Sequence, residues 1–399
     1  MTGQSTDATG QVTSLRSVGS TVYLPSLLFG IGQGAIIPVL VVSARELGAS
    51  LAVAGFVVAL MGIGKIVADV PAGVLADRVG ERRAMLVAIV IALVSLVVCV
   101  FAPAVWVLGA GVTGLGLAQA VWGLARQAYL TEVMPYHLRA RALSTLGGTQ
   151  RIGLFVGPFL SAGAVSLWGI GAAYGIHVVV VVIAGAVMLA LPEPPTGRAR
   201  RAPETPSGTL DTVRRHLPVL RTLAMGALLL SAVRAGRPVA IPLWAEHLGL
   251  DAAQTSLIFG VSGGIEALVF YPAGFLMDRY GRLFTVLMST IGLAAAYLLL
   301  PFTNGFVALM CVSAVMGLFN GMGSGINMTI SADVSPPDNR PTFLGVWRLL
   351  SDVGNGLGPV LVGGIAAVAL APAVASLGVV SGLSAVIMAV WLPRYSARR

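Results

Sequence analysis

The chain alternates long apolar runs with short polar segments along almost its whole length. A helix that crosses a bilayer needs about 20 predominantly apolar residues, and twelve runs approach or exceed that length. We expect spanning helices at residues 20–43, 52–76, 84–102, 105–131, 142–166, 170–191, 219–244, 254–277, 283–303, 305–332, 342–369 and 371–392. The pattern therefore predicts an all-α membrane protein with 12 transmembrane helices.

The polar segments divide the chain into two blocks of six spans. Residues 192–216 are rich in Pro, Arg, Thr and Ser and can neither span nor pack, so we interpret them as a cytosolic linker. Residues 1–19 are polar and lack the pattern of a signal peptide, which predicts a disordered cytosolic tail. The predicted organisation is an N-terminal six-helix half at 20–191, a C-terminal six-helix half at 217–393 and a cytosolic tail at 394–399.

Composition and charge agree with this topology. Apolar residues make up 56% of the chain and charged residues only 10%, whereas about a quarter of a soluble domain is charged. The net charge is +9, and the basic residues gather in the loops on one side of the predicted membrane, while the opposite loops hold only Arg45. This asymmetry predicts that both termini are cytosolic. It also explains the positive charge, so we expect no nucleic-acid partner.

The two halves repeat each other with a constant offset of 201 residues. The offset relates Gly73 to Gly274, Asp77-Arg78 to Asp278-Arg279, and Gly157-Pro158 to Gly358-Pro359, and no gap is needed. Because each half has an even number of spans, both enter the membrane in the same direction. Parallel six-helix repeats are typical of one class of secondary transporters, whose substrate site lies between the repeats near the midplane.

Three stretches carry a resemblance to a known family. The segment Gly73-Val74-Leu75-Ala76-Asp77-Arg78-Val79-Gly80-Glu81-Arg82-Arg83 resembles the loop signature of the major facilitator superfamily, and a weaker copy runs from Gly274 to Arg282. In the fifth span, Gly153-x-x-x-Gly157-Pro158-x-x-x-x-Gly163 looks like the signature of the antiporter branch. The stretch from Arg126 to Pro135 is similar to a pattern of bacterial drug exporters, although the glycines that usually follow the arginine precede it here.

The resemblance implies the major facilitator fold, transport rather than enzymatic activity, no cofactor and no metal. It also implies the plasma membrane of a bacterium, a monomer, and three partners: the lipid bilayer, a small-molecule substrate, and protons as the coupling ion. The absence of a nucleotide-binding glycine loop in the sequence argues against ATP-driven pumping.

The loop signature supplies candidates for a cytosolic latch between the halves. Gly73 and Gly80 lack side chains and are expected to allow close helix approach and a tight turn. Asp77 can accept hydrogen bonds from the amides at a neighbouring helix N-terminus, which the resemblance places in the eleventh span. Arg78 belongs to the same latch, and an alternative is that the basic residues only fix topology. Bends, static or hinged, are expected at Gly157, Pro158, Gly358 and Pro359 because proline removes a helix hydrogen bond.

Charged residues within spans are costly in hydrocarbon and usually face a partner or a cavity. The sequence has nine: Lys65, Asp69, Arg126, Arg151, Arg234, Arg237, Glu266, Arg348 and Asp352. The resemblance implies that the second span meets the eleventh and the fifth meets the eighth. With that arrangement, matching depths suggest pairs across the halves that separate during transport, namely Asp69 with Arg348, Lys65 with Asp352, and Arg151 with Glu266. The alternative is that each charge pairs within its own half or lines the cavity unpaired.

Coupling to protons requires a group that releases and regains a proton, and a buried carboxylate beside a cation can do so. Glu266 is the first candidate, followed by Asp69 and Asp352. The expected substrate cavity is net positive, which favours an anionic, zwitterionic or neutral amphiphile. Its candidate residues are Gln33, Trp122, Arg126, Arg234, Arg237, Asn320 and Asn327.

The sequence thus predicts a secondary transporter that works by alternating access and exports small amphiphilic compounds with proton coupling. The alternative within transport is a uniporter, importer or lipid translocator for an anionic metabolite or glycolipid. An alternative of another class is a non-transporting membrane sensor, since a fold alone does not prove transport.

Overall fold

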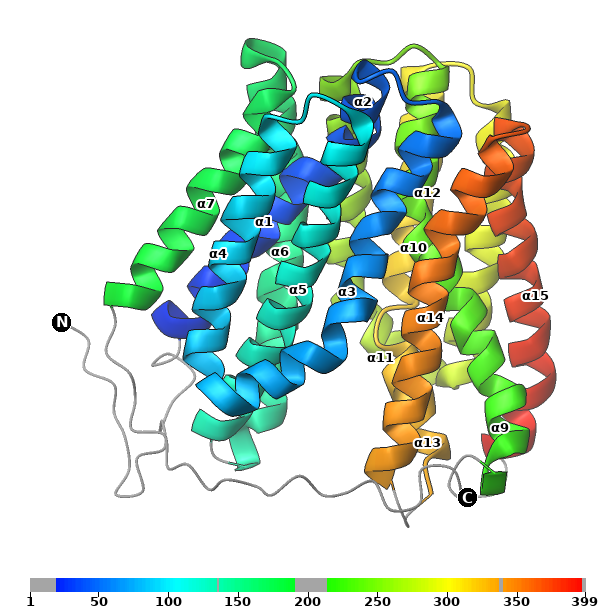
Figure 1. Ribbon diagram of the computed structural model, residues 1–399. Coiled ribbons are helices and arrows are strands. Elements are labelled where there is room, and N and C mark those ends of the chain that lie inside the picture. Colours follow the sequence, from blue (N-terminus) through cyan, green and yellow to red (C-terminus); the bar gives the residue numbers. More distant parts are fainter. Residues whose placement is uncertain (1–18, 135, 191–213, 337–339, 397–399) are drawn as a thin grey trace. The chain divides into compact units, whose positions relative to one another are not determined.

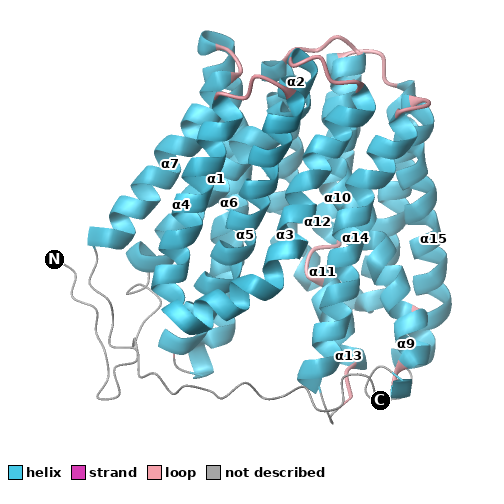
Figure 2. Ribbon diagram, in the orientation of Figure 1, coloured by secondary structure: helices cyan, strands magenta, loops and turns pink. Residues whose placement is uncertain are grey.

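The computed structural model describes residues 19–134, 136–190, 214–336 and 340–396. The expected N-terminal tail, most of the linker at 192–216 and the end of the C-terminal tail lie outside these residues. The described residues form helices joined by short turns (Figure 2).

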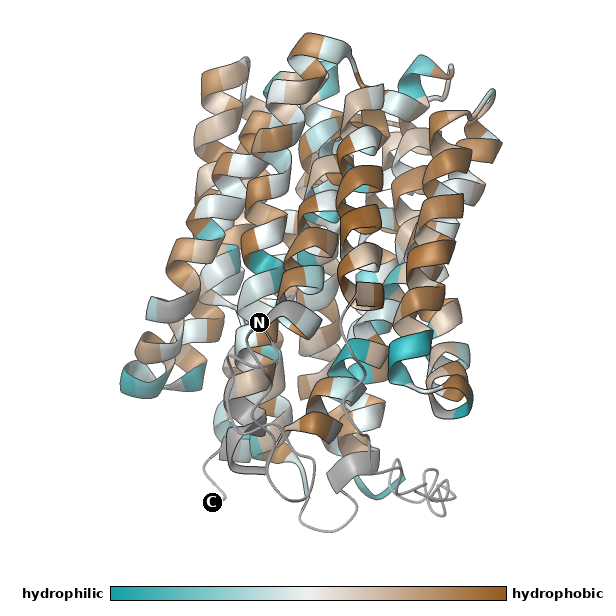
Figure 3. Ribbon diagram, turned by 90° about the vertical axis from the view of Figure 1, so that its left-hand side faces the viewer, coloured by the Kyte–Doolittle hydropathy of each residue, from teal (hydrophilic) through white to brown (hydrophobic). Residues whose placement is uncertain are grey.

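Within the described residues, twelve helices are long and apolar enough to cross a membrane, which confirms the predicted number of spans. Apolar residues run along most of the length of these helices (Figure 3). The first span joins a π-helical turn, η2 (Gly19–Tyr23), to α1 (Leu24–Ile36), η3 (Ile37–Val39) and α2 (Leu40–Glu46) (Figure 1). The next five spans contain α3 (Leu51–Val79), α4 (Glu81–Val100), α5 (Val105–Val133), α6 (Tyr136–Trp168) and α7 (Gly171–Ala190).

The remaining spans follow the same order. They contain α9 (Leu217–Arg221), α10 (Leu223–His247), α11 (Ala252–Leu299), η4 (Leu300–Phe302), α12 (Phe306–Met322), α13 (Ile326–Val334), α14 (Arg340–Ala366) and α15 (Leu370–Ser396). The long α11 holds two spans, and its backbone leaves helical geometry at Gly281, where φ is 88° and ψ is 167°. The predicted gap between the eighth and ninth spans lies at this point.

The described residues form two compact units. The first unit contains the described residues within Met1–Ala49, Val57–Arg200 and Ala252–Gly260. The second unit contains those within Ser50–Phe56, Arg201–Asp251 and Val261–Arg399. Within the first unit α1 packs against α6 and α7, and within the second α10 packs against α14 and α15. These are equivalent helices under the 201-residue offset, so the two units repeat the same internal packing.

Glycines make this repeated packing possible at matching positions. A methyl group on Gly157 would lie 2.3 Å from the carbonyl oxygen of Ile31, and one on Gly358 would lie 2.0 Å from that of Ala232. Ile31 and Ala232 are themselves related by the offset. The adjacent Pro158 and Pro359 lie inside helices α6 and α14. These glycines therefore serve close backbone contact, while the predicted bends remain a prediction.

The loop signature contributes a turn and not a close contact within its unit. Gly80 has a φ of 88°, which ends α3 and lets α4 begin at the next residue, so the expected tight turn is present. Gly73 differs from the expectation of close approach: within 4 Å of a methyl group placed there, the described part of the chain has no atom to contact. The backbone of Asp77 belongs to α3, but its side chain lies outside the description.

Candidate functional site: two equivalent polar sites, one in each unit

The second unit contains a network of polar side chains centred on Arg234 of α10. Its Nε donates to Asn320 Oδ1 at 2.8 Å, its Nη2 to the Asn320 carbonyl at 2.7 Å, and its Nη1 to the Gly323 carbonyl at 3.0 Å. The two side chains that the sequence assigned separately to a cavity are thus bonded to each other.

A break in the tenth span supplies the carbonyl groups for this network. Helix α12 ends at Met322, and Gly325 has a φ of 79° before α13 begins. The last carbonyls of a helix have no intrahelical partner and carry the negative end of the helix dipole. The guanidinium of Arg234 satisfies two of them, so the break and the arginine stabilise each other.

Arg237, one turn further along α10, forms an ion pair with Glu266 of α11. The distance from Arg237 Nη2 to Glu266 Oε2 is 2.7 Å, and the two side chains are 11% and 21% exposed. Ser262 Oγ lies 3.4 Å from Arg237 Nη1 and donates to the Ser313 carbonyl at 2.6 Å. For Glu266 the structure thus shows a partner in its own half, and the predicted pairing with Arg151 across the halves remains a prediction.

Two further groups in the second unit hold other predicted residues. Asn327 of α13 donates to the hydroxyls of Ser231 at 3.1 Å and Ser351 at 3.2 Å. Arg348 and Asp352, one turn apart on α14, approach to 3.8 Å. The arginine is 63% exposed, and the predicted pairings of these two residues across the halves remain predictions.

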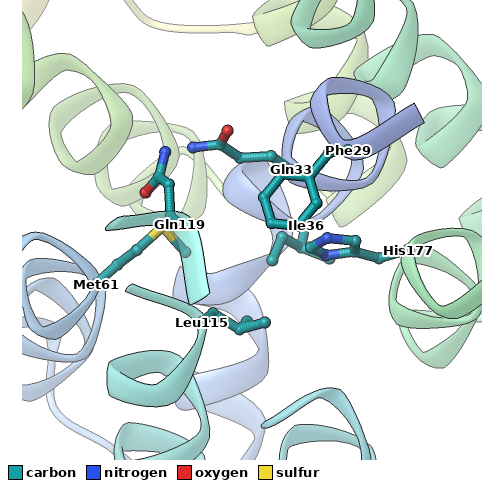
Figure 4. A pocket seen from close by; sticks show the side chains of 7 residues that line it. All are labelled: Phe29, Gln33, Ile36, Met61, Leu115, Gln119 and His177. Carbon is teal, nitrogen blue, oxygen red and sulfur yellow. The ribbon is translucent and has the colours of Figure 1, made fainter. Parts of the chain in front are cut away.

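The first unit contains a pocket at the positions that are equivalent, by the 201-residue offset, to the charged network of the second unit. The pocket is partly open, its empty space of about 240 Å³ includes open solvent, and its lining comes from α1, α3, α5 and α7. Figure 4 shows the amides of Gln33 and Gln119 on one side and the His177 ring on the other. The residues that line it are Phe29, Gln33, Ile36, Met61, Leu115, Gln119 and His177.

The sequence analysis missed Gln119 and His177, two polar residues of this pocket, and of the two His177 is the buried one. Its side chain is 2% exposed, and neither ring nitrogen has a hydrogen-bond partner among the described residues. The ring fits against α1 because residue 32 is a glycine, where a methyl group would lie 2.1 Å from His177 Cδ2. A histidine in the middle of a span of valines is the signal that would have found it.

An aromatic stack forms one wall of the pocket. Phe29 and Trp122 stack with ring centroids 5.0 Å apart and planes 9° apart, and the His177 ring meets Phe29 edge-on at 6.0 Å. Trp122 itself is only 1% exposed. Phe29 therefore lines the pocket, and the predicted cavity residue Trp122 supports it from behind.

Other charged candidates of the first unit lie elsewhere. Arg126, one turn after Trp122, donates to the side chain of Gln150, and its Nε and Nη1 have no hydrogen-bond acceptor in the described part of the chain. Lys65 and Asp69 are half-buried on α3, and Arg151 is half-buried on α6. Pairings of these residues across the units remain predictions.

The pocket and the network occupy equivalent places in the repeat. For four of the pocket residues, adding 201 gives a residue of the network: Gln33 corresponds to Arg234, Ile36 to Arg237, Met61 to Ser262 and Gln119 to Asn320. Lys65 likewise corresponds to Glu266. The same scaffold thus holds arginines bonded to polar partners in one unit and an uncharged pocket in the other.

These features define a class of protein. Twelve spans in two repeated units, with polar side chains held inside each unit, are the features of a membrane transporter. Among the described residues no group of three or more His, Cys, Asp or Glu is placed to hold a metal ion. A profile of the Major Facilitator Superfamily matches residues 22–236 and 223–399. The chain belongs to this superfamily, whose family and fold are those of transporters and not of enzymes.

Three known proteins show the range of similarity. An uncharacterized MFS-type transporter of Methanocaldococcus jannaschii is 25% identical over 125 residues, 31% of this chain and 32% of its own length. The multidrug resistance protein MdtG of Citrobacter koseri is 26% identical over 172 residues, 42% of this chain and 41% of that protein. These matches span well under half of each relative. The nucleoside transporter NupG has a TM-score of 0.78 at 16% identity, over 93% of this chain and 99% of NupG, which shows the fold alone.

Proposed function

We propose that this protein exports small amphiphilic compounds, drug-like or metabolite, by alternating access and proton coupling. The observation that carries the proposal is the ion pair of Arg237 and Glu266, which lies inside the second unit and within the predicted spans. A carboxylate in such a place can change its protonation state, because burial opposes its charge while a neighbouring cation favours it. The multidrug resistance protein among the relatives supports export.

In this proposal Glu266 accepts the proton and thereby loosens its hold on Arg237. The freed guanidinium then rearranges its contacts with Ser262 and with the substrate. Asp69 and Asp352 are further proton-coupling candidates. Gly73, Asp77, Arg78 and Gly80 act as the cytosolic latch, together with Lys65, Arg151 and Arg348. The proposal also includes that both termini lie in the cytosol of a bacterium, as the basic loops predict, and that the protein acts as a monomer.

The test uses purified full-length protein in liposomes with an imposed pH gradient and a panel of cationic, neutral and anionic fluorescent amphiphiles. We expect proton flux that depends on the transported compound. Glu266→Gln should abolish that flux while compound exchange without a gradient continues. Asp333→Asn is the matched control, because Asp333 also bonds an arginine, Arg282, at 2.9 Å but is 45% exposed; this variant should keep the coupled flux.

A uniporter or importer of an anionic metabolite is the second candidate, and the arginines Arg234 and Arg237 inside the second unit favour it. Compound movement that ignores the pH gradient would select this reading over antiport. A lipid translocator would move labelled glycolipid between leaflets. Failure to move any compound in a protein that still binds it would favour the non-transporting sensor.

A further inference from the structure

The pocket of the first unit has the features of a binding site whose ligand provides missing hydrogen bonds. Buried polar groups are almost always hydrogen-bonded in native proteins. Here Gln33 Oε1 and both ring nitrogens of His177 are buried without a partner among the described residues, and both side chains line the same pocket (Figure 4). Two unsatisfied residues facing one cavity indicate that something outside the chain satisfies them.

The lining determines the charge of that ligand. None of the seven described lining residues is an Asp, Glu, Lys or Arg. A protonated imidazole would bury a charge with no anion in this lining, so His177 is neutral, with one nitrogen as donor and the other as acceptor. The amides of Gln33 and Gln119 also offer both donors and acceptors. A neutral group that both gives and receives hydrogen bonds matches this set.

The apolar part of the lining determines the rest of the ligand. Phe29 stacks on Trp122 and is 3% exposed, and it forms the apolar lining together with Ile36, Met61 and Leu115. A flat apolar body is favourable against such a wall, because aromatic contacts add to the burial of apolar area. A water molecule would use the polar groups and leave the aromatic wall unused.

The comparison with the second unit shows that this pocket is a difference between the repeats. Arg234 and Arg237 extend from the positions equivalent to Gln33 and Ile36 and bond to the residues around them. The position equivalent to His177 is Gly378. The first unit thus combines shorter uncharged side chains with a histidine, which leaves room and unsatisfied polar atoms in one place.

We infer that the pocket lined by Phe29, Gln33, Gln119 and His177 is a substrate subsite for a neutral hydrogen-bonding group, such as an amide, on a flat apolar body. This inference rests on the proposed function, since it specifies the substrate class that such an exporter would recognise. It narrows the expectation of an anionic, zwitterionic or neutral substrate to a neutral one.

The test measures equilibrium binding to the full-length protein in lipid nanodiscs, with four probes that share a naphthalene body. They are 1-naphthamide, the cation 1-naphthylmethylammonium, the anion 1-naphthoate, and 1-methylnaphthalene, which lacks a polar group. We expect the amide to bind most tightly. His177→Leu should weaken amide binding by about tenfold, the value of one ordinary hydrogen bond, and should leave 1-methylnaphthalene unchanged.

Matched variants separate recognition from folding. His177→Gln keeps hydrogen bonding and should retain most of the amide affinity, and the exposed His247, changed to Leu, should have no effect. If His177→Leu does not fold, Gln33→Met removes the other unsatisfied group at similar size and should give the same loss. In nitrogen NMR of histidine-labelled protein, the signals of His177 can be identified because they are lost in His177→Gln. These signals should shift when 1-naphthamide is added.

Equal binding of all four probes, or amide binding that neither His177→Leu nor Gln33→Met weakens, would overturn the inference. Unchanged His177 signals with bound amide would overturn it as well and would leave water as the occupant. The binding test needs no pH gradient, so the proposed subsite and the proposed proton-coupled export can each fail without the other. Selective amide binding without coupled transport refutes only the exporter, and coupled transport without selective amide binding refutes only the subsite.

Discussion

Gln33 and Arg234 occupy the same position in the two repeats, on α1 and α10, and meet equivalent partners. Arg234 bonds the side chain of Asn320 at 2.8 Å, whereas Gln33 lines an open pocket with Gln119, the residue equivalent to Asn320. The tenth span is broken after Met322, whereas its equivalent α5 is continuous from Val105 to Val133, so this break and the side chains together make one site charged and the other neutral. In the proposed function, these two chemically different sites serve the proton and the substrate.

The buried ion pair gives the first prediction. Removing one member of a buried pair leaves an uncompensated charge and typically costs about 3–5 kcal/mol. We therefore expect Glu266→Gln to lower the free energy of unfolding by roughly 3 kcal/mol, and Arg237→Met with Glu266→Gln to lower it by less. Thermal unfolding in detergent measures both.

The exposed pair of Arg282 and Asp333 is the comparison for that measurement. Its side chains are 42% and 45% exposed, and such pairs contribute about 0–1 kcal/mol. Asp333→Asn should thus change the midpoint little. Equal losses for Asp333→Asn and Glu266→Gln would show that the buried pair contributes no more than a surface one.

The number of spans, their limits and the repeat were predictable because each depends on local hydrophobicity or on residue spacing. The polar sites were only partly predictable. The sequence identified Arg234, Arg237, Glu266 and Asn320 as important, since a charge or amide inside a span is costly. It did not show that Glu266 forms an ion pair with Arg237, because that pairing depends on which faces of α10 and α11 meet.

The pocket was harder to predict for a related reason. His177 carries no formal charge in a count of acidic and basic residues, and its space depends on Gly32, a residue 145 positions earlier in the chain. A single sequence contains no sign of such a distant fit. The same holds for Gly157, where a proline next to it suggested a bend while the structure shows a close contact with α1.

The second prediction concerns the antiporter-like signature in α6. A methyl group on Gly157 would lie 2.3 Å from the Ile31 carbonyl oxygen, whereas one on Gly163 would contact no described atom within 4 Å. Overpacking of this kind costs about 1–3 kcal/mol. We expect Gly157→Ala to lower the unfolding temperature and Gly163→Ala to leave it unchanged or raise it, since alanine favours the helix. The same result for both variants would contradict a packing role for this motif.

The third prediction concerns the turn between α3 and α4. Gly80 has a φ of 88° and a ψ of 154°, a region that is open essentially only to glycine, and other residues held in such regions pay about 1–3 kcal/mol. Gly80→Ala should therefore destabilise the protein by that amount. Gly73→Ala, seven residues earlier in the same signature, has open space within its unit and should not. If Gly73→Ala nevertheless stops transport in liposomes while the protein stays stable, residue 73 acts in the transport cycle and not in folding.

The last prediction tests the fit of His177 against α1. Gly32→Ala would place a methyl group 2.1 Å from His177 Cδ2 and 2.7 Å from Cγ, so the ring must move. The ring meets Phe29 edge-on and is buried, so it has little room to move. We therefore expect the free energy of unfolding to fall by roughly 1–3 kcal/mol.

Shortening the histidine should remove the clash, so Gly32→Ala combined with His177→Ala should be more stable than the sum of the two single changes predicts. Residues that touch show coupling of about 0.5–3 kcal/mol in such a cycle. Calorimetry of the two single variants, the double variant and the unchanged protein in the same detergent gives the four stabilities that this double-mutant cycle compares. Additive effects would mean that α1 and α7 do not fit together through this glycine and histidine, and the pocket would then lack the wall that positions His177.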